Sequence, residues 1–361
     1  MILKSLKLES YRNYSSCDLT LSPGINIFFG DNAQGKTNIL EAVYLSATTK
    51  SHKGSKDKEI IAFDQDESHI RSVWDKDGME YRVDMHLRKN KGKGIAINGQ
   101  GIKKSSQLLG LCSVVFFSPE DLSIIKEGPV ERRRFMDMEL CQMDASYLYN
   151  FTQYNKVVNQ RNALLKEMAF QDHMKDVLSV WNNQLISYGK KIIERRQKYN
   201  EDLNLIINQI HYDLSGKKED IKVIYHPNTT VESFEEDMRR NEERDLRYKM
   251  THTGPHKDDL IFEVNGVDIR KYGSQGQQRT AALSLKLSEI EMIRQMKHDN
   301  PILLLDDVLS ELDSSRQNFL LSRLGNIQTL VTCTGLDEFV KERIRMDQIY
   351  QVTNGVIHEY Q

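Results

Sequence analysis

An α/β lobe joined to a mainly helical second lobe is the fold class that the sequence predicts. Residues 25–44 have the pattern of a strand, a glycine-containing loop and a helix in succession. Residues 119–250 carry long, charged segments whose apolar positions repeat with helical spacing. Beyond residue 300, two short apolar runs have the composition of parallel strands that are buried on both faces. At 361 residues, the chain is long enough for two or three domains.

The first hundred residues predict an antiparallel layer around the strand-loop-helix unit. Apolar and polar side chains alternate from Tyr81 to Leu87, and Asn98-Gly99 is typical of a tight hairpin turn. Within this region Ile25–Phe29 is the strand candidate that precedes the glycine-containing loop. We therefore expect an antiparallel layer of short strands with the strand-loop-helix unit inside it.

The middle of the chain predicts helices with a shared apolar face. Tyr147, Phe151, Tyr154 and Val158 are spaced for one side of a helix, which we interpret as core packing rather than as a cofactor-binding or base-stacking surface. The α/β pattern then returns, with a helix around residues 283–290, strands at 302–305 and 329–332, and a last hairpin that turns at 354–355.

Composition narrows the class of protein. The four cysteines are far apart in the sequence and form no C-x-x-C pair, so we expect free thiols rather than a zinc site or disulfides: Cys17, Cys112, Cys141 and Cys333. The first residues lack the apolar segment of a signal peptide, and no stretch approaches the roughly 18 apolar residues of a membrane span. We expect a cytoplasmic protein.

One segment is strongly basic although the formal net charge of the chain is only −2. Residues 86–104 contain six lysines and arginines and no acidic residue: Arg88, Lys89, Lys91, Lys93, Lys103 and Lys104. Such a run is either a solvated hairpin or a surface that contacts phosphates of a nucleic acid. The sequence leaves both interpretations open.

A phosphate-binding loop lies between the strand and the helix near the start of the chain. Its pattern, G-x-x-x-x-G-K-[ST], is matched in full by Gly30, Asp31, Asn32, Ala33, Gln34, Gly35, Lys36 and Thr37. In this motif backbone N–H groups face the phosphates, Lys36 reaches the β- and γ-phosphates, and the Thr37 hydroxyl ligates magnesium. We therefore expect ATP and Mg²⁺ as cofactors.

A second acidic motif has the form that completes a magnesium site. The buried run Ile302–Leu305 is followed by Asp306, which we expect to bind Mg²⁺ through water, and by Asp307. Asp307 occupies the position that polarises the attacking water, where ABC-type ATPases usually place a longer glutamate. The shorter side chain predicts slow hydrolysis.

Lys271–Gln278 precedes a predicted helix and resembles the signature motif of ABC-type ATPases. In that class Ser274, Gly276 and Gln277 would act from a helix amino terminus on the γ-phosphate that the opposite subunit binds. Ser310–Asp313 follows the second acidic motif and resembles the D-loop of the same ATPases. The order of these motifs indicates an ABC-type, SMC/Rad50 head-like P-loop ATPase whose site is completed by dimerisation.

Further motifs along nearly the whole chain resemble those of the RecF family. They are Tyr11–Tyr14, Asn38, Phe117–Leu122, Gly128-Pro129 with Arg132–Phe135, Gly254–Asp259 and Ser274–Gln277. The resemblance implies an ATP-dependent homodimer that binds single-stranded or gapped duplex DNA, works with RecR and RecO, and helps RecA to load. It also implies slow, DNA-dependent ATP hydrolysis that serves as a switch, and it makes Arg12 a nucleotide contact.

Two positions depart from the expected pattern. ABC transporters place a histidine after the strand that follows the acidic motif, whereas residues 331–334 contain none, so Thr332, Thr334 or neither takes that contact. Lys257 stands where the RecF family commonly has arginine, which preserves charge but not bidentate geometry.

Three other classes share part of this pattern. An ABC transporter subunit would normally carry the missing histidine, a complete SMC or Rad50 head would separate the two ATP motifs by a coiled coil, and a P-loop kinase or small GTPase has no use for the signature. With the ABC-type assignment, we expect residues 1–118 to form the N-terminal part of the ATPase lobe and residues 119–250 the helical insertion lobe. Residues 251–361 would carry the signature and the C-terminal part of the ATPase lobe.

Overall fold

The computed structural model describes residues 1–167, 175–336 and 346–360. Within them the chain forms two units, one from Met1–Asp121 with Glu289–Gln361 and the other from Leu122–Ser288. The second unit therefore includes residues 251–288, which the sequence analysis grouped with the C-terminal part of the ATPase lobe. The helices in the described part of the chain are all too short or too polar to cross a membrane.

The first unit holds an antiparallel sheet in the order β2-β1-β4-β5-β6-β7. Its strands are β1 (Ile2–Tyr11), β2 (Tyr14–Thr20), β4 (Glu67–Lys76), β5 (Met79–Arg88), β6 (Lys91–Ile97) and β7 (Gln100–Gly101). The alternation predicted from Tyr81 to Leu87 lies on β5, where Val83, Met85 and Leu87 are buried. The predicted turn at residues 98–99 joins β6 to β7.

A second sheet in the same unit has the order β15-β14-β3-β13-β12-β8. Its strands are β3 (Ile25–Phe29), β8 (Val114–Phe117), β12 (Ile302–Asp306), β13 (Thr329–Cys333), β14 (Gln348–Thr353) and β15 (Val356–Glu359). All neighbours pair in parallel except β14 and β15, which form the predicted antiparallel hairpin. Every residue of β12 is buried, as expected for a parallel strand covered on both faces.

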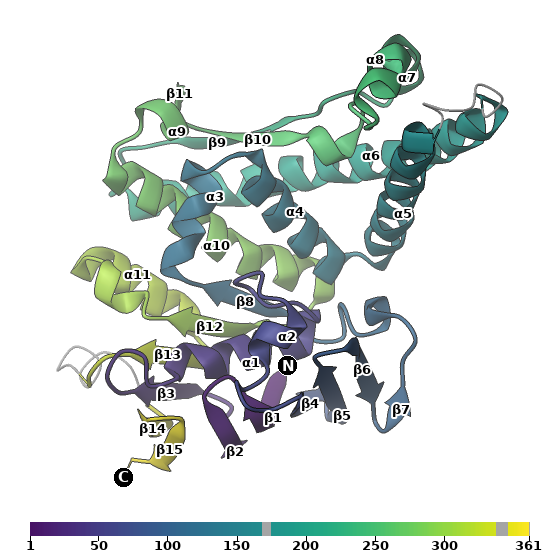
Figure 1. Cartoon of the computed structure of the whole chain (residues 1–361). Helices are drawn as coiled ribbons and strands as arrows, with labels where there is room; N and C mark the ends of the chain where they lie inside the picture. Colours follow the sequence, from purple (N-terminus) through teal and green to yellow (C-terminus); the bar gives the residue numbers. More distant parts are fainter. Residues whose placement is uncertain (168–174, 337–345, 361) are drawn as a thin grey trace. The chain divides into compact units, whose positions relative to one another are not determined.

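Helix α1 (Lys36–Thr48) contacts strands of both sheets, and Figure 1 shows it between them. Because apolar residues surround the helix, it buries nearly its whole circumference, including Ile39, Leu40 and Val43. The short helix α2 (Asp57–Ile60) and helix α11 (Ser314–Leu324) complete this unit, together with the turns η1 (Ser105–Gln107), η2 (Pro119–Asp121) and η6 (Leu309–Glu311). Burial of α1 fixes the loop that precedes it against the core.

The second unit is mainly helical. Its helices are α3 (Leu122–Lys126), α4 (Pro129–Met143), α5 (Ala145–Glu167), α6 (Lys175–Leu214), α7 (Phe234–Arg240), α8 (Glu242–Tyr248) and α9 (Ile269–Tyr272), with the turn η5 (Pro255–Lys257). Helix α10 (Gln275–Lys297) crosses the boundary between the units. Tyr147, Tyr154 and Val158 on α5 are buried, and the half-buried Phe151 stacks on Tyr147, which confirms the predicted core face.

The predicted helical insertion also contains a strand that the sequence analysis did not predict. Strand β9 (Ile221–His226) pairs with β10 (Asp259–Val264), which pairs with β11 (Val267–Asp268). The side chains of Ile221 and Val223 alternate toward the core of this sheet. A strand of six residues within long helical segments gives too short a periodic signal to stand out in the sequence.

Candidate nucleotide-binding site

The predicted phosphate-binding loop spans the interval between β3 and α1. Its backbone has positive φ at Gly30 (151°), Ala33 (63°) and Gly35 (114°). A Cβ atom on Gly30 would lie 2.3 Å from the carbonyl oxygen of Val352, and one on Gly35 would lie 2.5 Å from Nδ2 of Asn13. Backbone conformation therefore favours glycine at both positions, and at Gly30 the backbone of Val352 also leaves no room for a Cβ atom.

Lys36 points its ammonium group back over this loop. Its Nζ donates to the carbonyl oxygens of Gly30 (2.5 Å) and Asp31 (2.8 Å), and the residue is buried. Helix α1 has no acidic residue in its first turn, and its N-cap residue Gly35 offers no side-chain acceptor. A positive helix end with a lysine beside it is the arrangement that binds phosphate.

Thr37 and Asp306 meet although they are far apart in the sequence. The Thr37 hydroxyl donates to Oδ1 of Asp306 at 2.8 Å, and the Thr332 hydroxyl donates to the same oxygen at 2.7 Å. The sheet order explains this contact, because α1 follows β3 while Asp306 and Thr332 are paired residues near the ends of β12 and β13. The carboxyl ends of three adjacent parallel strands therefore converge on one carboxylate.

Asp307 follows in a left-handed backbone conformation, with φ of 53°. Its N–H donates to the Thr332 hydroxyl at 3.0 Å, and the Ser310 hydroxyl lies 2.7 Å from its carbonyl oxygen and 3.3 Å from its Oδ1. Aspartate adopts left-handed backbone more readily than glutamate. This conformation gives a local reason for aspartate at a position where glutamate is usual in ABC-type ATPases.

Gln34 is held by two segments whose role the sequence analysis did not predict. The side chain of Asn13 and the backbone N–H of Gly355 both donate to the Gln34 carbonyl, at 2.9 and 3.1 Å. The N–H of Asn354 donates to Oε1 of Gln34 at 2.6 Å. The turn of the C-terminal hairpin therefore supports the phosphate-binding loop, although the sequence marked it only as a turn.

Arg12 is held by a buried carboxylate. Its guanidinium donates to both oxygens of Glu41 at 2.8 and 2.9 Å, and also to the Glu59 carbonyl and the Ser55 hydroxyl. Burial raises the pKa of Glu41, but hydrogen bonds from Arg12 and Ser51 outweigh it and hold that pKa below its ordinary value. Arg12, in the turn between β1 and β2, is thus held in a fixed position against Glu41 of α1, and its predicted nucleotide contact stays a prediction.

The signature motif lies in the second unit, at the start of α10. Ser274 caps the helix by accepting from the N–H of Gln277 at 3.2 Å, and Gln277 Oε1 accepts from the N–H of Ser274 at 3.0 Å. Gln277 also donates to Glu219 at 2.9 Å. Ser274 and Gly276 are exposed, whereas the Gln277 side chain is used to orient the cap.

Comparisons with known proteins agree over the whole chain. Residues 2–358 match the family model described as the RecF/RecN/SMC N terminal domain. A protein of Lachnospira eligens named DNA replication and repair protein RecF is 57% identical, with 99% of this chain and 100% of that protein covered.

The chain belongs to the RecF family.

Solved structures agree with this assignment. The structure described as the recombination mediator protein RecF-ATP in the RecFOR pathway has a TM-score of 0.93 and 34% identity, covering 99% of this chain and 97% of that chain. An Smc head bound to the C-winged helix domain of ScpA has a TM-score of 0.57 at 15% identity, which concerns the fold alone. The predicted class, an ABC-type, SMC/Rad50 head-like α/β ATPase lobe with a mainly helical second lobe, is therefore confirmed.

A RecF-family motif that the sequence analysis singled out, Gly254–Asp259, organises the core of the second unit. Asp258 accepts from Arg196 at 2.8 Å and from the Tyr225 hydroxyl, and Asp259 forms a two-bond pair with Arg132 at 2.6 and 3.0 Å. Burial raises the pKa of Asp258 even though Arg196 opposes this change. Lys257 is exposed, so the departure from the family's arginine falls outside this buried network.

The lysines and arginines of residues 86–104, here called the basic hairpin, do not all have the same surroundings. Lys93 donates to the Thr49 carbonyl at 2.6 Å and pairs with Asp57 at 2.8 Å, so it holds β6 against the region of α2. Lys91, Lys103 and Lys104 are exposed. Lys93 therefore has an intramolecular role, while the exposed lysines keep both predicted interpretations.

Proposed function

We propose that the chain is an ATP-dependent DNA-binding protein of recombinational repair and replication. The observation that carries the proposal is that the hydroxyls of Thr37 and Thr332 both donate to Asp306. The chain is also similar over its full length to a RecF-ATP structure. A phosphate loop alone would fit many nucleotide-binding proteins. Asp306 beside the loop, with a carboxylate suited to bind Mg²⁺, and the RecF relatives narrow the proposal to this family.

The residues of the first unit fit ATP with magnesium. The loop from Gly30 to Thr37 would hold the phosphates through backbone N–H groups, with Lys36 as the positive charge near the β- and γ-phosphates. The Thr37 hydroxyl and Asp306 would hold Mg²⁺, which neutralises phosphate charge when bound. Asp307 would orient the attacking water, and its short side chain supports slow, DNA-dependent hydrolysis that serves as a switch.

Gly276 supports the proposal that the signature acts on a partner subunit's nucleotide. A Cβ atom there would approach no neighbouring atom closer than 3.9 Å, so packing within one chain does not require glycine. Glycine forms helices less well than alanine, by about 1 kcal/mol in a helix interior, so helix formation does not favour it here either. Close approach of another molecule would explain why the position lacks a side chain. Ser274 beside it is exposed and presents its hydroxyl at the same helix end.

The proposed substrate is single-stranded or gapped duplex DNA, bound by the ATP-driven homodimer. RecR and RecO are the proposed partners, with a functional link to RecA, because the similar RecF-ATP structure is described as a recombination mediator of the RecFOR pathway. Exposed lysines of the basic hairpin, Lys91, Lys103 and Lys104, are candidate phosphate contacts. The nucleic acid would be recognised through its backbone and its junction rather than its sequence.

Replacement of Ser274 by arginine tests the composite site. The substitution places a bulky cation at the signature surface, so we expect ATP-dependent dimerisation and ATP-dependent binding of gapped DNA to be lost. The affinity of the monomer for ATP should stay within about twofold, because the phosphate loop belongs to the first unit and Ser274 to the second. Sedimentation velocity with Mg²⁺-ATP, a fluorescent ATP-analogue titration and mobility shifts on gapped DNA measure these quantities.

Ser179→Arg is the matched control, because Ser179 is an exposed serine of the same unit, on α6 outside the signature. It should dimerise and bind DNA as the unmodified chain does. Dimerisation of Ser274→Arg at the normal ATP concentration would reject the role of the signature. A chain that binds gapped DNA equally well with and without ATP would reject the proposed function itself.

A further inference from the structure

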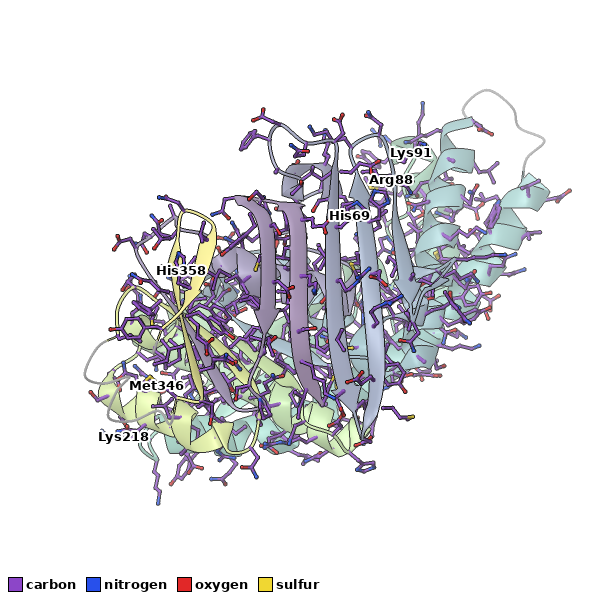
Figure 2. All side chains as sticks on the ribbon, turned by 90° about the horizontal axis from the view of Figure 1, so that it is seen from below. His69, Arg88, Lys91, Lys218, Met346 and His358 are labelled. Atoms are coloured by element: carbon purple, nitrogen blue, oxygen red, sulfur yellow. The ribbon has the colours of Figure 1, made fainter. Side chains whose placement is uncertain are left out.

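The exposed face of the antiparallel sheet carries an ordered row of ionisable side chains. Strand pairing places Glu9 opposite His69 and His69 opposite His86, so the three residues cross β1, β4 and β5 in one row. Figure 2 shows this face of the sheet, with His69 among the side chains that project from it. Paired residues on adjacent strands point to the same side, so the row is a direct result of register.

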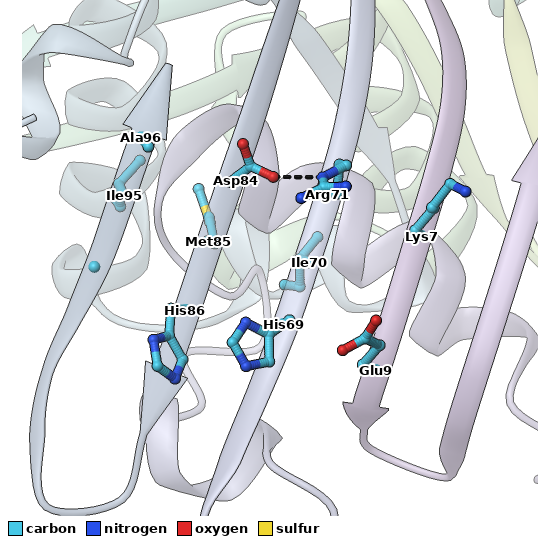
Figure 3. Close-up of a pocket in the computed structure, with 11 residues that line it drawn as sticks. Lys7, Glu9, His69, Ile70, Arg71, Asp84, Met85, His86, Ile95 and Ala96 are labelled. Atoms are coloured by element: carbon cyan, nitrogen blue, oxygen red, sulfur yellow. Dashed lines mark hydrogen bonds and ion pairs between the residues drawn. The ribbon is translucent and has the colours of Figure 1, made fainter. Parts of the chain in front are cut away.

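A shallow hollow of about 420 Å³ lies over this row. Small residues on β6 form part of its floor, with Gly94 paired to His86 and Ala96 paired to Asp84. Figure 3 shows His69 and His86 side by side at one end of the hollow and the Arg71–Asp84 ion pair farther along the strands. The hollow leaves the two imidazoles accessible from solvent.

Two histidines and one glutamate converge at that end. The rings of His69 and His86 stack with centroids 4.2 Å apart and an interplanar angle of 20°. Glu67, two residues before His69 on β4, lies with its Oε2 2.7 Å from Nε2 of His86. One ligand-type atom from each of the three residues lies within 4.8 Å of the others.

We propose that Glu67, His69 and His86 form a binding site for a divalent transition-metal ion of the Zn²⁺ class. Two imidazole nitrogens and one carboxylate oxygen are donors that Zn²⁺ and its neighbours prefer, whereas Mg²⁺ and Ca²⁺ prefer oxygen ligands. Ligand atoms around tetrahedral zinc lie about 3.4 Å apart, given metal–ligand distances near 2.1 Å. Small rotations of these accessible side chains close the remaining distance.

The charges around the three residues are mixed. Arg88 lies opposite Glu67 in the strand register, and its guanidinium donates to the Gly92 carbonyl at 2.9 Å. Arg71, farther along the strands, has a carboxylate partner in Asp84. The carboxylates of Glu67 and of Glu9, which pairs with His69, supply the negative charge that attracts a cation.

Binding replaces a hydrogen bond by a metal bond. In the contact between Glu67 and His86 the carboxylate accepts, so Nε2 of His86 carries the proton in that hydrogen bond. A metal that binds at this nitrogen takes the place of the N–H, and the neutral ring then carries its proton on Nδ1. Three protein ligands leave one tetrahedral position for water or for a side chain of another molecule. The bound ion would clamp β4 to β5 at the exposed face.

The test is a titration of the full chain, freed of metal by a chelator, with Zn²⁺ alone in excess Mg²⁺ near neutral pH. Isothermal calorimetry should give one saturable site per chain. Co²⁺ in place of Zn²⁺ should give the visible absorption of a nitrogen- and oxygen-ligated ion. His69→Ala with His86→Ala should weaken binding by roughly a hundredfold, and Glu67→Gln by roughly tenfold or more.

His358→Ala is the matched control, because His358 is an exposed histidine on β15 away from the row, as Figure 2 shows. It should bind Zn²⁺ as the unmodified chain does. ATP-analogue binding by each variant checks that the fold is intact. Absence of a saturable site, or equal affinity in the double-histidine variant and the unmodified chain, would overturn the proposal and leave the three residues as a surface ion pair with a stacked ring.

Discussion

Thr332 donates a hydrogen bond to Asp306, the residue proposed to bind Mg²⁺, and removal of its hydroxyl should change both stability and nucleotide binding. The residue is only 1% exposed, its hydroxyl donates to Asp306 at 2.7 Å, and the same oxygen accepts from the N–H of Asp307 at 3.0 Å. Thr332→Val keeps the shape of the side chain and removes both hydrogen bonds. The substitution therefore isolates the hydroxyl.

The expected cost follows from these two hydrogen bonds. Loss of a bond to a charged group costs about 1.5–3 kcal/mol. The N–H of Asp307 retains a longer contact of 3.3 Å with the carbonyl of Thr332, so its loss adds less. We expect a free energy of unfolding lower by about 2–3 kcal/mol, and for a unit of this size a melting temperature lower by about 4–12 °C.

Nucleotide binding should change in the same direction. Asp306 would lose one of the two hydroxyl donors that orient it, so we expect Mg²⁺-dependent ATP affinity to fall by about tenfold, or 1.4 kcal/mol. Urea unfolding gives the stability, and fluorescent ATP-analogue titrations with and without Mg²⁺ give the affinity. Thr332→Ser keeps the hydroxyl and should restore the Mg²⁺ dependence, with a stability loss of about 1 kcal/mol for the missing methyl group.

The result also tests both roles considered for Thr332. If Thr332→Val unfolds within about 0.5 kcal/mol of the unmodified chain and binds Mg²⁺-ATP equally well, the hydroxyl neither orients Asp306 nor contacts the γ-phosphate. Thr334, which is exposed just beyond β13, would then be the next residue to test for the switch contact.

Three further predictions use the same structure. Lys36→Ala should weaken ATP-analogue binding at least tenfold. Among the described residues, Lys36 has the only ammonium group held over Gly30–Gly35, and the variant removes it. Unchanged affinity would show that this loop is not part of the nucleotide site. The pKa of Glu41 is held below its ordinary value, so its pairing with Arg12 stabilises the fold fully above the ordinary glutamate range, about 4.3, and this stabilisation is lost as pH falls through the lower folded-state pKa. Urea unfolding from neutral to acidic pH should therefore show the difference between the unmodified chain and Glu41→Gln shrinking at low pH, and a difference that grows on acidification would contradict the pairing. The double variant Lys91→Ala, Lys103→Ala should reduce the slope of log K against log salt concentration for DNA binding by about 1.8. An unaltered slope would favour the interpretation of the basic hairpin as solvated.

Most of the fold and part of the candidate site could be predicted from short local motifs in the sequence. The phosphate loop, the apolar run before Asp306 and the hairpin turn at 354–355 are each read from neighbouring residues. Their backbone conformations depend on glycine content, strand burial and turn preference, which short segments express directly. Strand β9 was missed because its signal is short and its pairing partner β10 comes more than thirty residues later.

Pairings between distant segments were decided only by the tertiary structure. The sequence by itself predicted that Thr37 and Asp306 bind Mg²⁺, but the strand order decided that the Thr37 and Thr332 hydroxyls donate to the same oxygen of Asp306. The family resemblance predicted a nucleotide contact for Arg12. Only the packing of α1 showed that Glu41 is the buried partner of this residue. The row that places His69 beside His86 depends on register across strands. A sequence states which side chains a strand carries, while hydrogen bonding between strands sets which of them become neighbours.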